Sequence, residues 1–191
     1  MARRLSAIAL AATLAACQVA DRGANASPAT YGLGSPATPA EVAALNTDVS
    51  PSGEGLPAGR GDAARGAALY QAQCASCHGV NGEGIAPNPP LVGREPREGF
   101  PFGTDPKLVR TVGNYWPEAT TIFDYIKRTM PLSAPGSLSD EEVYSLTAHL
   151  LVANEILPAG SALDSASLVA VRMPARDRFV PDNRRGGAVV R

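Results

Sequence analysis

The pentapeptide Cys-Ala-Ser-Cys-His at residues 74–78 limits what this chain can be more than any other feature. It contains two of the three cysteines of the chain, Cys74 and Cys77, and His78 is one of only two histidines. Two thiols and an imidazole at this spacing suit three kinds of chemistry: a redox-active dithiol, a zinc site, or the covalent attachment of a haem. The compartment of the chain and the surroundings of the motif distinguish these alternatives.

The N-terminus has the composition of an export signal. Arg3 and Arg4 precede a largely apolar stretch at residues 5–16, which is too short to cross a bilayer. The next residue is Cys17, and the sequence Leu-Ala-Ala-Cys at this point resembles the lipobox of bacterial lipoproteins. We therefore predict a signal peptide of lipoprotein type at residues 1–16 and a lipid on Cys17, which anchors the chain at a membrane surface in the periplasm. The alternative is ordinary cleavage after the Ala-Asn-Ala of residues 24–26.

Helix signals predict an all-α protein with four to five helices. Cap residues and apolar spacing indicate helical segments at residues 39–46, 62–73, 106–112, 117–129 and 139–154. The last segment has the clearest start, because Ser139 and Glu142 are spaced as a capping box. No stretch alternates apolar and polar residues for long enough to predict a strand.

The helical signals gather in one part of the chain. Residues 17–60 are rich in Pro, Gly, Ser and Ala, so we expect a tether there. Residues 61–157 are expected to form one domain, and residues 158–191 an irregular C-terminal extension.

Composition and context decide between the three readings of the motif. The formal net charge of −1 lacks the basic excess of a nucleic-acid-binding protein, so no nucleic-acid partner is expected. A thioredoxin-like dithiol follows a strand, and a zinc site needs four ligands, but no second Cys/His cluster is present. An exported C-x-x-C-H chain with only 5% aromatic residues gains from a large apolar group to fold around. We predict one covalent haem c, attached through Cys74 and Cys77, with His78 as an axial iron ligand.

An electron-transfer haem needs a second axial ligand on its opposite face. The candidates in this chain are Met130, Met173 and His149, since Met1 belongs to the predicted signal peptide. A methionine at any one position is more often a filler of the core than a ligand. The residues alone leave the three candidates open.

Residues 61–154 resemble the class I c-type cytochromes. The resemblance rests on the C-x-x-C-H motif, on Gly66 and Tyr70 before it, and on the late segment "SLTAHLL". It implies a fold around one covalently bound haem, in which the first and last helices pack together. It also implies an axial methionine in the loop before the last helix, which is Met130. Ligation by His78 and Met130 leaves no open iron site, which implies a carrier of single electrons and not an enzyme.

The same resemblance assigns supporting roles to four residues. "NPPLVG" is similar to the Pro-x-Leu-x-Gly of the family, which implies that the Pro89 carbonyl accepts a hydrogen bond from Nδ1–H of His78. Leu91 would then pack on the macrocycle. Tyr115 and Trp116 in "GNYWP" are candidates to bind a haem propionate through O–H and N–H, with simple packing in the core as the alternative.

Four longer stretches, which begin at Tyr31, Leu69, Gly113 and Val171, are similar to a narrower family. This family is the SoxD-like cytochrome c subunits of bacterial sulfite/sulfur dehydrogenases, and residues 113–126, "GNYWPEATTIFDYI", are the most specific part. The resemblance implies a molybdopterin-containing partner subunit that oxidises sulfite or a sulfane group, and a downstream cytochrome or oxidase that takes the electrons. Longer members carry a second haem, whereas this chain has a single C-x-x-C-H.

Two other functions stay open from the sequence. One is an independent membrane-anchored shuttle to a terminal oxidase, which a long free tether would favour. The other is a peroxidase or gas sensor, which requires a vacant or displaceable sixth ligand.

Overall fold

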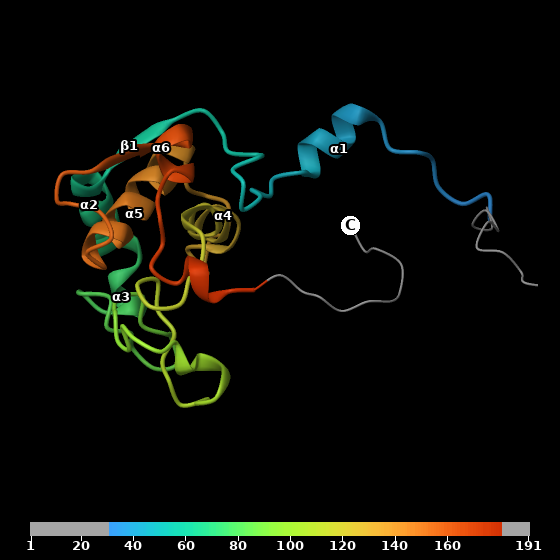
Figure 1. Ribbon diagram of the computed structural model, residues 1–191. Coiled ribbons are helices and arrows are strands. Elements are labelled where there is room, and N and C mark those ends of the chain that lie inside the picture. The colour runs from blue at the N-terminus through green and yellow to red at the C-terminus, as the bar shows by residue number, and fades with distance from the viewer. Residues whose placement is uncertain (1–30, 181–191) are drawn as a thin grey trace, which may run out of the picture. The chain divides into compact units, whose positions relative to one another are not determined.

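The computed structural model describes residues 31–180, so the predicted signal peptide and Cys17 lie outside the described residues. The chain divides into residues 1–38 and residues 39–191. Residues 31–38, the described part of the first unit, contain no helix or strand. The described elements of the second unit are α1 (Pro39–Leu45), β1 (Arg60–Asp62), α2 (Ala63–Gln73), α3 (Ala75–His78), α4 (Ala119–Thr129), α5 (Asp140–Ala153), β2 (Ala162–Asp164), α6 (Ser165–Val169), and the 3₁₀ turns η1 (Pro101–Gly103) and η2 (Arg176–Arg178) (Figure 1). The prediction of a mostly helical protein is confirmed.

Helices α2 and α5 start where their cap residues predict. The Asp62 side chain accepts a hydrogen bond from the backbone N–H of Arg65 at 2.9 Å and caps α2. At α5 the Ser139 hydroxyl accepts from the N–H of Glu142 at 3.3 Å, and the Glu142 carboxylate accepts from the N–H of Ser139 at 2.8 Å. This capping box satisfies backbone donors that a helix start otherwise leaves unpaired.

The crossing of α2 and α5 forms the centre of the core (Figure 1). Residues 143–148 of α5 are buried throughout, which shows that this helix is surrounded by the rest of the domain. Gly66 of α2 lies against the backbone of Ser145, and a Cβ at Gly66 would overlap the Ser145 carbonyl. The absence of a side chain at Gly66 therefore sets how closely the two helices approach.

The helix predicted at residues 106–112 does not form. Asp105 does accept a hydrogen bond from the N–H of Lys107 at 2.9 Å, but the chain then stays irregular. Asn114 explains why: its Oδ1 accepts from the N–H of Thr111 at 2.8 Å, and its Nδ2 donates to the Val109 carbonyl at 3.0 Å. These side-chain bonds replace the backbone bonds of a helix.

The start of one helix and the presence of two strands also differ from the prediction. Helix α4 begins at Ala119, two residues after the predicted start at Pro117, with Glu118 as its N-cap. The strands β1 and β2, which the sequence did not predict, pair antiparallel with Gly61 opposite Leu163. Each has only three residues, too few for an alternation pattern to be recognised.

The segment after residue 157 is more regular than expected. Besides β2 it contains α6, which begins with a capping box between Asp164 and Ser167. Leu163, Leu168 and Met173 are 3%, 0% and 2% exposed, so this segment closes the core of the domain. The expectation of an irregular chain is therefore wrong for residues 162–169.

Part of the expected tether is also bound to the domain. The backbone N–H of Val49 donates to Asp124 Oδ1 at 2.8 Å, and Val49 itself is buried. The Tyr144 hydroxyl donates to the Pro57 carbonyl at 2.8 Å. Residues 49–57 therefore lie along α4 and α5. Within residues 31–180, no helix combines the length and the apolar character needed to cross a membrane.

His149 makes the α2–α5 contact sensitive to pH. Its ring lies 5.1 Å from the ring of Tyr70, and burial lowers the pKa of His149 below 6.5. The unfolded chain therefore binds more protons than the folded one below about pH 6.5, so the free energy of unfolding falls as the pH drops through this range. We expect His149→Gln to flatten the pH dependence of urea unfolding between about pH 5 and 7. An unchanged slope would assign the dependence to other groups.

Candidate functional site

The Cys-x-x-C-His motif lies where α2 ends and α3 begins. Cys74 is the C-cap of α2, and the short helix α3 carries Cys77 and His78. The Cys74 side chain is half-buried and packs against the core, whereas Cys77 is exposed, and both are free thiols. Both sulfur atoms are therefore available for bonds to a group bound against this surface.

The His78 ring is oriented by the chain that follows it. Its Nδ1 lies 2.8 Å from the carbonyl oxygen of Pro89, as the family resemblance implies. A carbonyl oxygen only accepts hydrogen bonds, so this contact puts the hydrogen on Nδ1. Nε2 then keeps its lone pair, and a hydrogen bond of this kind makes an imidazole a stronger metal ligand.

Close backbone approaches fold residues 78–92 into a compact loop. The N–H of Gly84 donates to the His78 carbonyl at 2.7 Å, and the N–H of Leu91 donates to the Gly82 carbonyl at 2.8 Å. Gly82 and Gly84 have φ of 79° and 81°, a conformation that disfavours side chains with a Cβ. A Cβ on Gly82 would also overlap Val92. The two glycines thus allow Pro89 to return to His78.

Asn154 is a residue of this site that the sequence analysis missed. It is the C-cap of α5 and is fully buried, at 0% exposure. Its Oδ1 accepts from the N–H of Gly93 at 3.0 Å, and its Nδ2 donates to the carbonyls of Leu91 at 3.2 Å and Leu150 at 2.9 Å. Asn154 therefore ties the end of α5 to the loop that orients His78. Asparagine is common at helix C-termini, so the sequence could have indicated Asn154 as the cap of α5.

Substitution of Asn154 should loosen this loop. In Asn154→Leu the part-buried N–H of Gly93 loses its partner, whereas the Leu91 carbonyl keeps the hydrogen bond from the N–H of Val112 at 3.2 Å. An unsatisfied buried group costs about 1–3 kcal/mol. We expect a lower free energy of unfolding and a broadened His78 ring signal in the NMR spectrum. Asn154→Asp, which keeps Oδ1, should retain part of the effect. A destabilised variant with an unchanged histidine signal would limit Asn154 to a purely structural role.

The three candidates for the second axial ligand differ in their surroundings. Met130 is the C-cap of α4, in the loop before α5, and its half-exposed side chain packs against the edge of the core. Met173 is only 2% exposed and belongs to the core cluster. His149 is half-buried beside Tyr70 in the α2–α5 contact. Of the two methionines, Met130 is therefore the one that is not enclosed in the core.

Leu91 and Trp116 have the same kind of surroundings as Met130. Both are partly buried and pack against the core cluster, and the Trp116 ring meets the Tyr125 ring edge-on, with 5.9 Å between centroids. Tyr115 lies differently. Its ring stacks on Phe100 at 5.7 Å in a cluster with Phe102 and Phe179, so packing accounts for it. Cys74, Leu91, Trp116 and Met130 are thus all only partly covered by the core.

The structure disfavours the other two readings of the motif. No three His, Cys, Asp or Glu side chains within residues 31–180 are grouped to hold a metal ion, so a zinc site lacks its ligands. Burial, with the neighbouring Cys77 as a lesser cause, raises the pKa of the Cys74 thiol to about 11. Such a thiol is neutral near pH 7, so Cys74 would not itself serve as the attacking thiolate. Neither β1 nor β2 leads into the motif as a thioredoxin-like arrangement requires.

The donor set fits a covalently attached haem. Two free thiols are available for thioether bonds, the His78 ring has its Nδ1 hydrogen-bonded to Pro89 and its Nε2 left for a metal, and the partly buried Met130 supplies a neutral thioether. The half-covered apolar side chains would be shielded from water by a large flat apolar group. The residues that are present therefore suit haem c.

Comparison with known proteins identifies the domain. Residues 61–150 match the family model described as cytochrome c oxidase, cbb3-type, subunit III. The chain is 37% identical over 90 residues to a thiosulfate dehydrogenase of Allochromatium vinosum and 32% identical over 99 residues to one of Stutzerimonas stutzeri. These matches cover 47% and 49% of this chain. They span only 31% and 28% of the two relatives, so the chain corresponds to about a third of each.

A solved structure extends the similarity beyond this domain. A chain of the sulfane dehydrogenase SoxCD from Paracoccus pantotrophus is 39% identical, with a TM-score of 0.70. The match covers 81% of this chain and 74% of that chain. The protein therefore belongs to the class I c-type cytochromes, which bind haem c covalently, and it is a relative of a SoxCD chain.

Proposed function

We propose that this protein is a monohaem c-type cytochrome that accepts single electrons from a molybdenum sulfite/sulfur dehydrogenase subunit. The observation that carries the proposal is the extent of the SoxCD match. The cytochrome family model covers only residues 61–150, whereas the similarity to the SoxCD chain covers 81% of this chain. A general electron carrier would share the haem domain, but it would have no reason to share the flanking segments.

The haem is proposed to be attached through Cys74 and Cys77, with His78 and Met130 as its axial ligands. The haem supplies the one-electron couple. The Pro89 carbonyl holds the His78 ring through the 2.8 Å hydrogen bond to Nδ1, which would leave Nε2 to hold the haem iron. The Met130 sulfur adds a neutral ligand that stabilises the reduced state. Both coordination positions are then filled, which favours electron transfer over catalysis.

The apolar residues Leu91 and Trp116 are proposed to keep water away from the haem iron. Leu91 and Trp116 are half-covered by the core and are proposed to be covered on their other side by the haem. The N–H of Trp116 is proposed to bind a propionate, and Tyr115 remains a second candidate for that role. Exclusion of water lowers the rearrangement needed when the charge on the iron changes.

The position of residues 49–57 supports a bound subunit over a free shuttle. A shuttle needs a long free tether, but Val49 and Pro57 are held to Asp124 and Tyr144 on the domain. Because residues 49–57 are bound to the domain, they do not lengthen a tether between the domain and the membrane. We propose that the chain is periplasmic, anchored by lipid on Cys17, and that a downstream cytochrome or oxidase removes its electrons. The free membrane-anchored shuttle is the alternative.

An optical experiment tests the proposal. The protein is extracted gently from its native membranes in the oxidised state, and its spectrum is recorded before and after addition of sulfite. Reduced c-type bands are expected, because a co-purified dehydrogenase subunit delivers electrons to the haem. The isolated recombinant holoprotein, which lacks the partner, is the control and should stay oxidised. If only a chemical reductant produces the bands in both samples, the free shuttle becomes the better description.

The proposed anchor has a separate test. Cys17→Ala should move the protein from the membrane fraction to the soluble periplasmic fraction, because the lipid is attached to that sulfur. The haem spectrum should be unchanged. A variant that stays with the membrane would contradict the lipid anchor.

A further inference from the structure

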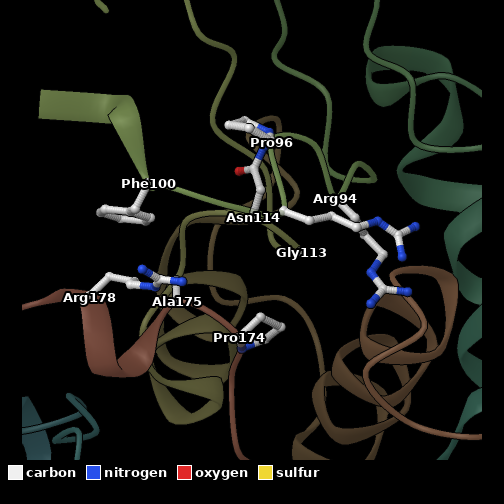
Figure 2. A pocket seen from close by; sticks show the side chains of 9 residues that line it. Arg94, Pro96, Phe100, Gly113, Asn114, Pro174, Ala175 and Arg178 are labelled. Atoms are coloured by element: carbon white, nitrogen blue, oxygen red, sulfur yellow. The ribbon is translucent and has the colours of Figure 1, made fainter. Parts of the chain in front are cut away.

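A small pocket lies away from the Cys-x-x-C-His motif, between the loop at residues 94–100 and the turn η2. Its volume is about 140 Å³, smaller than the roughly 300–1,000 Å³ of sites for larger organic ligands. Figure 2 shows Arg94 and Arg178 on opposite sides of it, with Gly113 and Asn114 between them. The pocket thus has room for a few waters or for one small polyatomic ion.

All charged side chains that line the pocket are positive. They are Arg94, Arg97 and Arg178, and no carboxylate is among the lining residues. Pro96, Phe100 and Pro174 contribute apolar walls. A guanidinium offers a planar set of donors that matches two oxygens of an anion, so a small pocket lined by arginines suits an oxyanion.

Two of the arginines have carboxylate partners at the edge of the pocket. Arg94 pairs with Glu155, and Arg97 pairs with Glu95 at 2.9 Å. Both carboxylates are largely exposed, at 71% and 76%, and exposed ion pairs are weak. Arg178 has no carboxylate partner within residues 31–180. Arg178 is therefore the lining charge that no carboxylate within residues 31–180 offsets.

We propose that this pocket binds a small oxyanion of the size of sulfate, held by Arg178 together with Arg94 and Arg97. The wall of the pocket is continuous with the loop that orients His78. Arg94 follows Gly93, whose N–H donates to Asn154 at 3.0 Å, and Gly113 lies against Asn154 and Gly93. An anion on Arg94 is therefore linked to the Pro89 loop through Gly93 and Asn154. This site does not depend on the identity of the electron donor.

Isothermal titration of the isolated oxidised holoprotein with sodium sulfate tests the proposal. Sulfate is redox-inert, so its binding is measured separately from any electron transfer, and sodium chloride keeps the ionic strength constant. Wild-type protein should bind saturably with one site. Arg178→Gln should bind at least tenfold more weakly. Arg65→Gln, which removes an exposed arginine of α2 that does not line the pocket, should bind like wild type.

Further measurements keep the result decisive. Arg97→Gln is a second variant in case Arg178→Gln does not fold, and thermal unfolding without sulfate checks both. The proposal is overturned if wild type shows no saturable heat, or if Arg178→Gln binds like Arg65→Gln. It is also overturned if acetate binds as well as sulfate, since the pocket would then be a carboxylate site. A changed haem spectrum in Arg178→Gln without any anion would identify a haem propionate as the occupant and would overturn it too.

Discussion

Met130→Ala is expected to lower the reduction potential of the haem sharply and to open one coordination position of the iron. The thioether sulfur of methionine stabilises the reduced iron, and axial ligands together set haem potentials over a range of ~0.8 V. The loss of Met130 leaves water or no ligand in its place. We expect the potential to fall by a sizeable part of that range, and the reduced variant to bind carbon monoxide readily.

The haem itself should remain in this variant, because the proposed attachment through Cys74 and Cys77 does not involve Met130. Spectroelectrochemical titration gives the potential, and the far-red sulfur-to-iron absorption band of the oxidised protein reports methionine ligation directly. The wild-type protein should show this band and Met130→Ala should not.

Met173→Leu is the matched control for this prediction. Met173 is 2% exposed in the core, and replacement of methionine by leucine of similar volume usually costs less than about 1.5 kcal/mol. The variant should keep the sulfur-to-iron band and the potential of the wild type. The opposite result, in which Met173→Leu loses the band and Met130→Ala keeps it, would move the second axial ligand to Met173.

Gly66→Ala is expected to destabilise the protein by about 2–4 kcal/mol. Alanine in place of glycine inside a helix normally gains roughly 0.5–1 kcal/mol. At Gly66, however, the new Cβ overlaps the carbonyl of Ser145 and comes within 2.8 Å of the Cβ of His149. The overlap with Ser145 is with backbone, which cannot turn aside, so α2 and α5 must move apart. Overpacking of this kind costs about 1–3 kcal/mol, and more where nothing can adjust.

The expected measurement is a lower urea midpoint and a Tm reduced by roughly 4–16 °C, at about 2–4 °C per kcal/mol. Gly103→Ala is the control. A Cβ at Gly103 would have no neighbour within 4 Å, so its effect should stay within about 0.5 kcal/mol. Equal stability of the two variants would mean that α2 and α5 are not in the close contact described.

The parts of the fold that the sequence predicted well are those with short-range signals. Ser139 and Glu142 start α5 through contacts three residues apart, and the sequence shows both residues. Pro89 approaches His78 at a fixed spacing within one loop, which the family resemblance supplied. Local chemistry of this kind is visible in a sequence because both partners stand close together in it.

Long-range partners account for most of what was missed. Asn154 meets Gly93 across 61 positions, and nothing near Asn154 in the sequence names that partner. The strand β1 pairs with β2 about a hundred residues later, and each is too short to predict alone. At residues 106–112 the local helix signal was real, but Asn114 took over the hydrogen bonds. Tertiary contacts decided these three cases.

Helix α5 connects the two sides of the proposed haem site and sets the distance between them. Its N-cap, Ser139, follows the loop that begins at Met130. Its C-cap, Asn154, is hydrogen-bonded to the loop that begins after His78. The helix has 14 residues, which gives a rod about 21 Å long at 1.5 Å per residue. A helix resists stretching, so the spacing between the two ligand loops is held by one stiff part. A change of oxidation state at the proposed haem would then need little rearrangement of the two loops.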